Sequence, residues 1–316
     1  MKILANDGIS QSGVQALENA GYEVITTKVA QEQLENYINE KQVDAILVRS
    51  ATQVRKELID ACPSLKLIGR GGVGMDNIDV EYAREKGLHV INTPAASSAS
   101  VAELVFAHLF GGVRYLFDAN RNMPLDGDTK FKDLKKHYAG GIELRGKTLG
   151  IVGFGRIGQE VAKIAIGCGM TVLAHDRFVG KAEIELDFFD GQSAVFNVET
   201  IALDELLSQS DFISLHVPAQ KDYVIGKEQI SMMKDGAAII NAARGGVLDE
   251  VALIEALENK KLAFAALDTF ENEPKPAVKV LMNQKVSLSP HIGAATKEAQ
   301  DRIGTELAGQ IQELLG

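Results

Sequence analysis

The feature that most constrains the fold lies almost halfway along the chain, where residues 150–176 read GIVGFGRIGQEVAKIAIGCGMTVLAHD. A short apolar strand runs into a glycine-rich turn, a helical pattern follows, and a second apolar strand ends at an acidic residue. The glycines have the spacing GxGxxG, and this order of elements directs the first amides of the helix toward the turn. The stretch therefore predicts a parallel α/β sheet with an anion site at the carboxyl end of a strand.

The residue types in this stretch favour one kind of anion. Gly153 permits a tight bend, Gly155 lets a pyrophosphate approach the backbone, and Gly158 lets the helix pack on the strand. Asp176 follows at about the 20-residue offset at which a carboxylate accepts hydrogen bonds from ribose hydroxyls and repels a 2′-phosphate. NAD is therefore favoured over NADP, with Arg177 as the residue that would temper the preference. The predicted cofactor contacts of this stretch are Gly153, Gly155, Arg156, Ile157, Gly158 and Asp176.

Short apolar strands alternate with helical patterns in two separate series, which is typical of parallel sheets. The strands of the first series are KILA, YEVITT, DAILVRS, KLIGRGG and LHVINT. Those of the second are TLGIVGFG, TVLAHD, FISLHVP, AAIINAA, AFAALDTF and KVSLSPHIG. Residues 98–122, between the two series, have helical spacing and are predicted to form one long connecting or interface helix. Residues 295–316 are predicted to form a last helix.

The predicted fold is α/β, with two doubly wound parallel-sheet domains. A flavodoxin-like substrate domain takes residues 1–97 and 292–316, and a Rossmann NAD-binding domain takes residues 98–291. We expect a cleft between the domains at the carboxyl ends of both sheets, because open α/β sheets bind ligands there.

Composition excludes several classes of function. The formal net charge of −10 argues against a general binder of nucleic acid or of anionic membranes. The N-terminus turns polar by Asn6, and no apolar run approaches the roughly 20 residues that a bilayer requires, so a cytoplasmic location is predicted. Cys62 and Cys168 lie far apart and are interpreted as packing residues. No disulfide and no metal site is expected.

Several motifs together carry a family resemblance. They are VRSAT, GRGGVGMDNID, NTPAASSASVAELV, ELRGKTLGIVGFGRIG, HVP, NAARGGVLDE, ALDTFENEP and SPHIGAAT. Over nearly its whole length the chain resembles the D-isomer-specific 2-hydroxyacid dehydrogenases, and within that family the members that oxidise phosphoglycerate in serine biosynthesis. The resemblance implies an NAD-dependent oxidoreductase.

The resemblance assigns catalysis to Arg244, Glu273 and His291. A histidine suits the role of base for the substrate hydroxyl, because its pKa lies near working pH. A carboxylate such as Glu273 would orient the imidazole and favour its protonated form. The guanidinium of Arg244 matches a substrate carboxylate and can polarise a carbonyl oxygen. Glu271 is interpreted as the surface carboxylate of its pair.

The resemblance also implies further cofactor contacts. These are Val73, His216, Val217, Pro218, Ala242, Ala243, Asp268, Gly293 and Ala294, with Asp268 near the nicotinamide. The side chains of His216, His108 and His137 are interpreted as packing or surface residues.

A glycine-rich loop, Gly71 to Gly74, can present backbone amides to a substrate carboxylate, although a plain tight turn is the alternative. Three cations, Arg49, Arg70 and Lys136, occupy positions that resemble anion contacts of the family, although each alone is more often a solvated surface charge. The predicted substrate contacts are Arg49, Ser50, Arg70, Gly72, Val73, Gly74 and Lys136. As a set near one cleft, the cations favour a phosphorylated substrate.

Two segments depart from the family pattern. The NTP motif continues as AASS, and residues 178–197 lack the usual spacing, so we expect an altered surface beside the adenosine.

The function predicted from the sequence is oxidation of D-3-phosphoglycerate to 3-phosphohydroxypyruvate by a homodimer. A glycerate or hydroxypyruvate reductase is the near alternative, since it would share the catalytic residues and differ in the anion contacts. An NAD-sensing corepressor of the C-terminal-binding-protein type is the alternative from another class.

Overall fold

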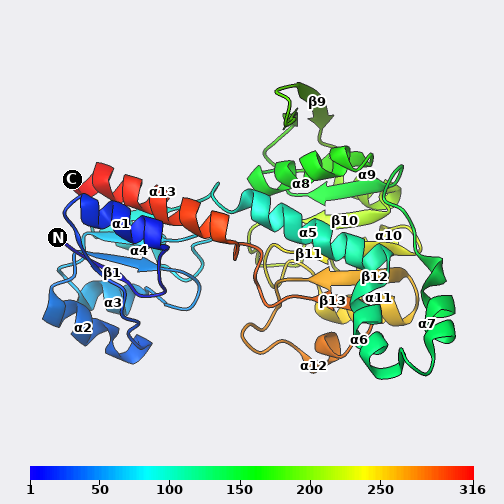
Figure 1. Cartoon of the computed structure of the whole chain (residues 1–316). Coiled ribbons are helices and arrows are strands. Elements are labelled where there is room, and N and C mark those ends of the chain that lie inside the picture. The colour runs from blue at the N-terminus through cyan, green and yellow to red at the C-terminus, as the bar shows by residue number, and fades with distance from the viewer. The chain divides into compact units, whose positions relative to one another are not determined.

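The computed structural model describes residues 1–316, and internal contacts divide them into two compact units. The first unit comprises Met1–Ser100 and Ala294–Gly316, and the second comprises Val101–Gly293. The sequence analysis places these boundaries at 97/98 and 291/292. Each unit is built on a parallel sheet (Figure 1), so the predicted α/β class is confirmed.

The first unit has a five-stranded sheet in the order β2-β1-β3-β4-β5. Its strands are β1 (Lys2–Ala5), β2 (Glu23–Ile25), β3 (Ala45–Val48), β4 (Leu67–Arg70) and β5 (His89–Asn92). Its helical elements are α1 (Gln11–Asn19), η1 (Gln31–Gln33), α2 (Leu34–Lys41), α3 (Lys56–Ala61), α4 (Val80–Glu85) and α13 (Lys297–Leu315). This is the flavodoxin-like order, in which the chain reverses direction across the sheet between β1 and β3.

The last helix of the chain, α13, returns to the first unit and lies beside α1 (Figure 1). Two facing glycines allow this approach, because a Cβ on Gly13 would lie 2.8 Å from the Cα of Gly304. Both helices start at a capping hydroxyl: Ser10 accepts from the Gly13 amide, and Thr296 accepts from the Ala299 amide. Residues separated by almost the whole chain thus form one core.

The second unit has a six-stranded sheet in the order β13-β12-β11-β10-β6-β7. Its strands are β6 (Thr148–Val152), β7 (Thr171–His175), β10 (Phe212–Leu215), β11 (Ala237–Asn241), β12 (Leu262–Leu267) and β13 (Val286–Leu288). Its main helices are α5 (Ser98–Val113), α8 (Arg156–Gly167), α9 (Leu203–Gln209), α10 (Lys227–Met232), α11 (Glu250–Glu258) and α12 (Val278–Leu281). After β7 the chain crosses to the other side of β6 and forms β10. Ligands bind outside such a reversal in doubly wound folds.

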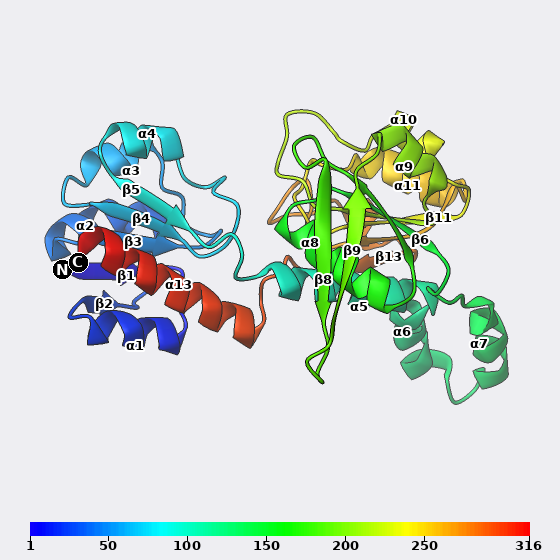
Figure 2. The ribbon, with the colours of Figure 1, turned by 90° about the horizontal axis from the view of Figure 1, so that it is seen from above.

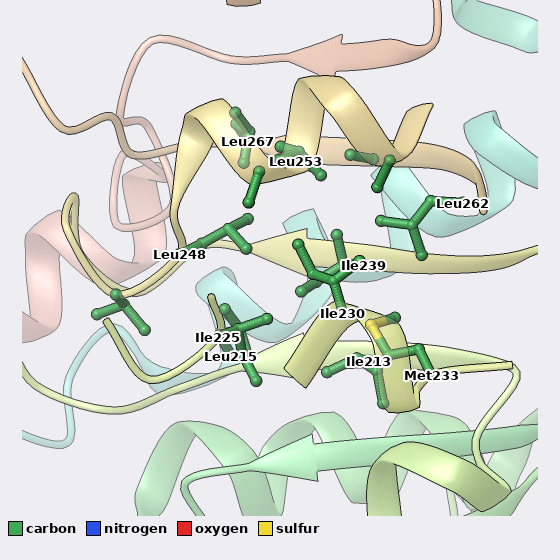
Figure 3. Close-up of a cluster of buried hydrophobic side chains, with 14 of the residues drawn as sticks. Ile213, Leu215, Ile225, Ile230, Met233, Ile239, Leu248, Leu253, Leu262 and Leu267 are labelled. Carbon is green, nitrogen blue, oxygen red and sulfur yellow. The ribbon is translucent and has the colours of Figure 1, made fainter. Parts of the chain in front are cut away.

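Alternate residues of these strands enter separate cores on the two faces of the sheet. On one face, Ile213, Leu215 and Ile239 pack with apolar residues of α9, α10 and α11 (Figure 3). On the other face, Phe212 and Ile240 pack with residues of α5 and α8. Helices therefore cover both faces, as a parallel sheet requires.

The expectation of one long helix over residues 98–122 is wrong. The helix ends at Val113 because Tyr115 adopts a left-handed backbone with φ of 54°, and a new helix, α6 (Leu116–Asp126), continues at an angle of 57°. Then follow α7 (Phe131–His137) and η2 (Tyr138–Gly140). No single helix has the length and apolar composition to cross a membrane, and α5 and α6 meet those criteria only when taken together across their bend.

Residues 178–197, which depart from the family spacing, lie largely in an antiparallel hairpin (Figure 2). Its strands, β8 (Lys181–Asp187) and β9 (Ser193–Glu199), pair in register over their full length. Ala182, Ile184 and Leu186 face the core beside α8, while the residues between them are exposed. The period-2 alternation and the turn glycine Gly191, with φ of 84°, are strand and hairpin signals that the sequence analysis left unassigned.

Candidate functional site

The glycine-rich turn joins β6 to α8. Gly153 has a φ of 94°, and a Cβ there would lie 2.5 Å from the carbonyl oxygen of His216. A Cβ on Gly158 would lie 2.2 Å from the oxygen of Gly153, so this glycine allows α8 to pack against the turn. A Cβ on Gly155, in contrast, would meet nothing within 4 Å. The outer two glycines serve the packing of the backbone, and the middle one borders open space.

This open space lies at the N-terminus of a 12-residue helix. Arg156 and Ile157 form its first turn, and no side chain caps its free amides. Uncapped amides and the positive end of the helix dipole together form a site for an anion. The cradle at Gly155 therefore fits the pyrophosphate of a dinucleotide.

Asp176 follows β7 and is fixed against the same turn. Its Oδ2 accepts the Phe154 amide at 2.7 Å, and its Oδ1 accepts the amides of Phe178 at 2.8 Å and Val179 at 3.0 Å. Burial opposes ionisation, but the amide hydrogen bonds outweigh it and lower the pKa of Asp176. The residue is therefore an ionised carboxylate next to the phosphate cradle, the position expected for a group that accepts from ribose hydroxyls.

The end of β10 borders the turn on its other side. The His216 amide donates to the Val152 carbonyl at 2.7 Å, and the ring Nε2 pairs with Ser214 Oγ at 2.8 Å. Burial lowers the pKa of His216 to about 3, so the imidazole is neutral. Val217 and Pro218 follow at the same edge of the sheet.

Arg244 lies in the loop after β11. Asn241 shapes this loop: its Oδ1 accepts the Ala243 amide at 3.1 Å, and its Nδ2 donates to the Arg244 carbonyl at 2.9 Å. Arg244 Nη1 donates to the Ala243 carbonyl at 2.7 Å. A Cβ on Gly245 would lie 1.9 Å from the carbonyl oxygen of Phe270, in the loop after β12. The absence of a side chain at Gly245 therefore brings the two loops together.

Glu273 and His291 form a hydrogen-bonded pair between the loops after β12 and β13. The imidazole Nδ1 lies 2.8 Å from Glu273 Oε2, and the other carboxylate oxygen accepts the Phe270 amide at 3.0 Å. The two side chains are 39% and 36% exposed, for His291 and Glu273 respectively. Because Nδ1 faces the carboxylate, Nε2 is the nitrogen that can exchange a proton with a substrate.

Asp268 lies beneath this histidine and is 2% exposed. Its Oδ1 accepts the Ser289 hydroxyl at 2.6 Å and the Ile292 amide at 2.9 Å, and its Oδ2 accepts the Gly293 amide at 2.9 Å. The carboxylate therefore holds the Ser289 side chain before His291 and the backbone amides that directly follow it. Its predicted place near the nicotinamide stays a prediction.

The interpretation of Glu271 as a surface carboxylate is wrong. Glu271 is half-buried, its Oε1 accepts the Glu250 amide at 3.0 Å, and its own amide donates to Glu250 Oε1 at 2.8 Å. This reciprocal pairing holds Glu271 at the start of α11. The spacing of residues along the sequence does not reveal such a contact. Burial and the nearby carboxylates of Glu271 and Glu273 raise the pKa of Glu250.

The predicted residues of the second unit follow successive strands along one edge of its sheet. His291 follows β13, Glu273 and Asp268 follow β12, and Arg244 with Ala242 and Ala243 follow β11. His216, Val217 and Pro218 follow β10, the glycine turn follows β6, and Asp176 follows β7. This order places the Glu273–His291 pair and the Arg244 guanidinium at one end of the edge and the dinucleotide cradle at the other.

In the first unit, Arg49 lies at the point where the strand order reverses. Asp7, after β1, accepts the Arg49 amide at 2.7 Å through Oδ2. Arg49 directly follows β3, and Arg70 ends the neighbouring β4. A Cβ on Gly71 would lie 3.8 Å from Arg49 Cγ, so the arginine stem lies against the glycine loop. Both arginines therefore belong to the carboxyl edge of the first sheet.

The glycine loop itself is shaped by Arg70. Gly72 has a φ of 142°, and a Cβ there would lie 1.6 Å from Arg70 Nη1, so only glycine admits the guanidinium at this place. Asn92 Nδ2 donates to the Val73 carbonyl at 2.7 Å. Gly74 is half-buried, and Ser50 and Val73 are exposed.

Lys136 does not share a unit with these arginines. It is exposed on α7, in the second unit (Figure 2), whereas Arg49 and Arg70 share one sheet edge in the first. Ala294, the last predicted cofactor contact, begins the second segment of the first unit, and Gln300 Nε2 donates to its carbonyl at 2.7 Å.

Comparison with known proteins shows which family the chain is similar to. Residues 106–293 match the family described as D-isomer specific 2-hydroxyacid dehydrogenase, NAD binding domain. The chain is 42% identical to a D-3-phosphoglycerate dehydrogenase of Methanocaldococcus jannaschii, with 100% of the chain aligned to 57% of that protein. It therefore spans little more than half of that relative.

Two further proteins are similar over almost their full length. A hydroxypyruvate reductase of Thermotoga maritima is 43% identical, with 100% of the chain and 98% of that protein aligned. The solved structure of a D-lactate dehydrogenase from Aquifex aeolicus, complexed with NAD and lactic acid, has a TM-score of 0.76 and 31% identity. The match covers 100% of the chain and 95% of that structure.

Proposed function

Because the chain belongs to the D-isomer-specific 2-hydroxyacid dehydrogenase family, we propose that it oxidises D-3-phosphoglycerate to 3-phosphohydroxypyruvate with NAD. The observation that carries the proposal is the 2.8 Å pair of Glu273 and His291, on the same sheet edge as a dinucleotide cradle. The reaction is reversible, and the reduction of the keto acid is the direction that is easier to assay. We assign it to serine biosynthesis.

In this reaction the chain moves a proton and fixes the substrate. His291 Nε2 takes the proton of the C2 hydroxyl. Glu273, which contacts Nδ1, stabilises the imidazolium that forms. Arg244 pairs with the substrate carboxylate through its guanidinium and polarises the C2 oxygen. NAD held by the glycine turn and Asp176 would supply the hydride acceptor that oxidation at C2 requires.

Asp176 is proposed to select NAD by accepting from the adenosine ribose. The other cofactor contacts remain as the sequence analysis assigns them: the backbone of the glycine turn, the loops after β10 and β11, Asp268, and the flanking residues Val73, Gly293 and Ala294.

The proposal of a phosphorylated substrate rests on the first unit. Arg49 and Arg70 place two cationic side chains at the sheet edge that carries the loop of Gly71 to Gly74, a combination suited to an anion with more than one charge. Lys136 is retained as a proposed phosphate contact. The name of the Methanocaldococcus relative supports the same substrate.

A hydroxypyruvate reductase is the second candidate. It is favoured by the Thermotoga relative, whose length the chain matches almost completely. A panel of 3-phosphohydroxypyruvate, hydroxypyruvate, glyoxylate and pyruvate, followed by NADH consumption, separates the two. The proposal expects the highest kcat/KM for the phosphorylated acid, and a preference for hydroxypyruvate would replace it with the second candidate. Binding of NADH without turnover of any acid would instead favour a corepressor-type protein.

We further propose that the protein is a homodimer that joins through α5, α6 and α7. Leu116, Leu125 and Phe131 in this region are 64%, 75% and 57% exposed. Such a gathering of large apolar side chains is typical of an interface. Light scattering should give twice the mass of 34.0 kDa, and Leu125→Glu should lower it.

A further inference from the structure

A buried histidine on α5 has no role in the mechanism above. His108 is 7% exposed, and both ring nitrogens are engaged. Nδ1 lies 2.8 Å from Ser287 Oγ on β13, and Nε2 lies 2.9 Å from Ser289 Oγ, just beyond the end of that strand. The interpretation of His108 as an ordinary packing or surface residue therefore misses a bridge between α5 and the strand that leads to His291.

The bridge continues to the carboxylate beneath the catalytic loop. Ser289 Oγ donates to Asp268 Oδ1 at 2.6 Å, and the same carboxylate accepts the amides of Ile292 and Gly293 at 2.9 Å each. These two residues directly follow His291. Side chains and amides thus form a continuous chain of hydrogen bonds from His108 to the backbone beside the catalytic imidazole.

The direction of each hydrogen bond follows from the groups involved. An ionised carboxylate only accepts, so Ser289 uses its proton toward Asp268. The Ser289 oxygen must then accept from His108, which places the ring proton on Nε2. Nδ1 is left to accept from Ser287. Burial lowers the pKa of His108 although the charge of Asp268 opposes this, which agrees with a neutral ring carrying one proton.

The backbone that this chain of bonds reaches is one that needs support. His291 has a left-handed φ of 54°, a strained conformation that a residue other than glycine keeps only where its surroundings hold it. Asp268 holds the backbone after it, and Glu273 holds its ring. A Ser289 hydroxyl that turned away would remove one donor from Asp268 and leave the carboxylate free to tilt away from the loop.

We propose that His108 is a positioning residue for the catalytic histidine. From α5 it fixes the Ser289 hydroxyl on Asp268, which in turn fixes the backbone at His291 and the direction of the imidazole. It touches neither substrate nor cofactor. The inference rests on the proposed function only in naming His291 as the base, because the hydrogen bonds themselves do not depend on the substrate.

The kinetic test compares three variants at α5. His108→Leu removes both hydrogen bonds and should lower kcat by about tenfold or more, because small misplacement of a catalytic group is costly. KM for the keto acid should stay within about twofold, because His108 is buried and lies outside the proposed substrate contacts. His108→Gln keeps a donor near Nε2 and should recover most of kcat. Leu109→Ala, at a fully buried neighbour on the same helix, is the control and should lower Tm while leaving kcat unchanged.

Two serine variants locate the effect. Ser289→Ala should reproduce the kcat loss of His108→Leu, and the double variant should lose no more than either alone, because both break the same chain of bonds. Ser287→Ala leaves the link to Asp268 intact and should have kcat near that of the parent. Equal kcat in His108→Leu and Leu109→Ala, or no rescue by His108→Gln, would overturn the proposal.

A measurement without substrate separates this proposal from the proposed function. Long-range proton–nitrogen NMR spectra of the histidine rings should show His108 protonated at Nε2. The ring signals of His291 should shift in His108→Leu but not in Leu109→Ala. If the protein reduced none of the four keto acids yet His291 responded in this way, the proposed function would fail and the positioning role would stand. Unchanged His291 signals would contradict the positioning role whatever the activity.

Discussion

The two sheets of the molecule share a topology and differ in what lies at their carboxyl edges. In the second unit, Glu273 fixes His291, Asp268 fixes the backbone beside it, and Asn241 fixes the loop of Arg244. In the first unit, the side chains of Arg49 and Arg70 lie against a loop of glycines, and Arg70 donates to the Gly71 carbonyl. The doubly wound topology therefore gives both units a place for a ligand, and the hydrogen bonds of the loops decide which edge can move a proton.

From this difference we propose that the edge of the second unit carries the chemistry and that the edge of the first recognises the anion. Variants of the second edge should lower turnover for every substrate by a similar factor. Variants of the first should discriminate between substrates by charge.

Replacement of the catalytic histidine should have the largest effect. Asparagine is the suitable substitute, because it tolerates the left-handed backbone at this position better than alanine does. His291→Asn should lower kcat by about 10²–10⁴-fold, the usual contribution of a general acid or base, and leave the Kd of NADH unchanged. Steady-state kinetics and fluorescence titration check the two parts. Full activity would move proton transfer to another group.

Arg244→Lys should have the next largest effect. An ammonium cannot reproduce the planar pair of donors, so kcat/KM should fall by about tenfold to a hundredfold, corresponding to roughly 1.5–3 kcal/mol for a charge-assisted hydrogen bond. The loss should be alike for hydroxypyruvate and its phosphorylated form, since both have the carboxylate. A loss confined to one of them would assign Arg244 to recognition of the phosphate.

Asp176→Ala should change the choice of cofactor by a smaller factor. Loss of the ribose acceptor should weaken NADH by about threefold to tenfold per hydrogen bond and should remove the repulsion of a 2′-phosphate. The substitution also frees the Phe154 amide and so loosens the glycine turn, which affects the binding of both cofactors. The quantity to measure is therefore the ratio of kcat/KM for NADH to that for NADPH. An unchanged ratio would mean that the preference arises elsewhere.

Acidification should lower the stability of the second unit more than that of the first. Burial lowers the pKa of His216 from its ordinary 6.5 to about 3, and that of His108 also falls, while the first unit's histidine, His89, is exposed. As pH falls, His216 is protonated in the unfolded chain before it is protonated in the folded chain. The free energy of unfolding of the second unit therefore falls as pH drops from 6.5 toward 3. Hydrogen exchange against pH should show a shallower slope for the second unit in His216→Gln than in the parent. Identical slopes would remove His216 as the cause.

Local patterns suffice to predict much of this molecule. Both series of strands, the glycine turn and the terminal helix follow from periodicity and turn residues that act over a few positions. The bend at Tyr115 and the burial of Glu271 do not, because a left-handed residue and a reciprocal pair with Glu250 depend on distant packing. The contacts of His108 show most clearly what local sequence patterns do not predict, since its partners Ser287 and Ser289 lie about 180 residues further along the chain.

The hairpin of β8 and β9 is only partly predictable from local sequence patterns. Its alternating residues and its glycine turn were present in the sequence, but the helix usual between strands of a doubly wound sheet is the competing expectation there. The spacing alone therefore predicts that residues 178–197 differ from the family pattern, but it does not predict that they form a hairpin.

The most direct test of the division between the two edges uses one variant from the first unit and two substrates. Arg49→Gln removes a proposed phosphate contact, and Arg84→Gln, an exposed arginine paired with Glu81 in the same unit, is the matched control. We predict that Arg49→Gln lowers kcat/KM for 3-phosphohydroxypyruvate by about tenfold or more, through KM, and changes that for hydroxypyruvate far less. Arg84→Gln should alter neither. Equal losses for the two substrates in Arg49→Gln would contradict the assignment of phosphate recognition to the first unit.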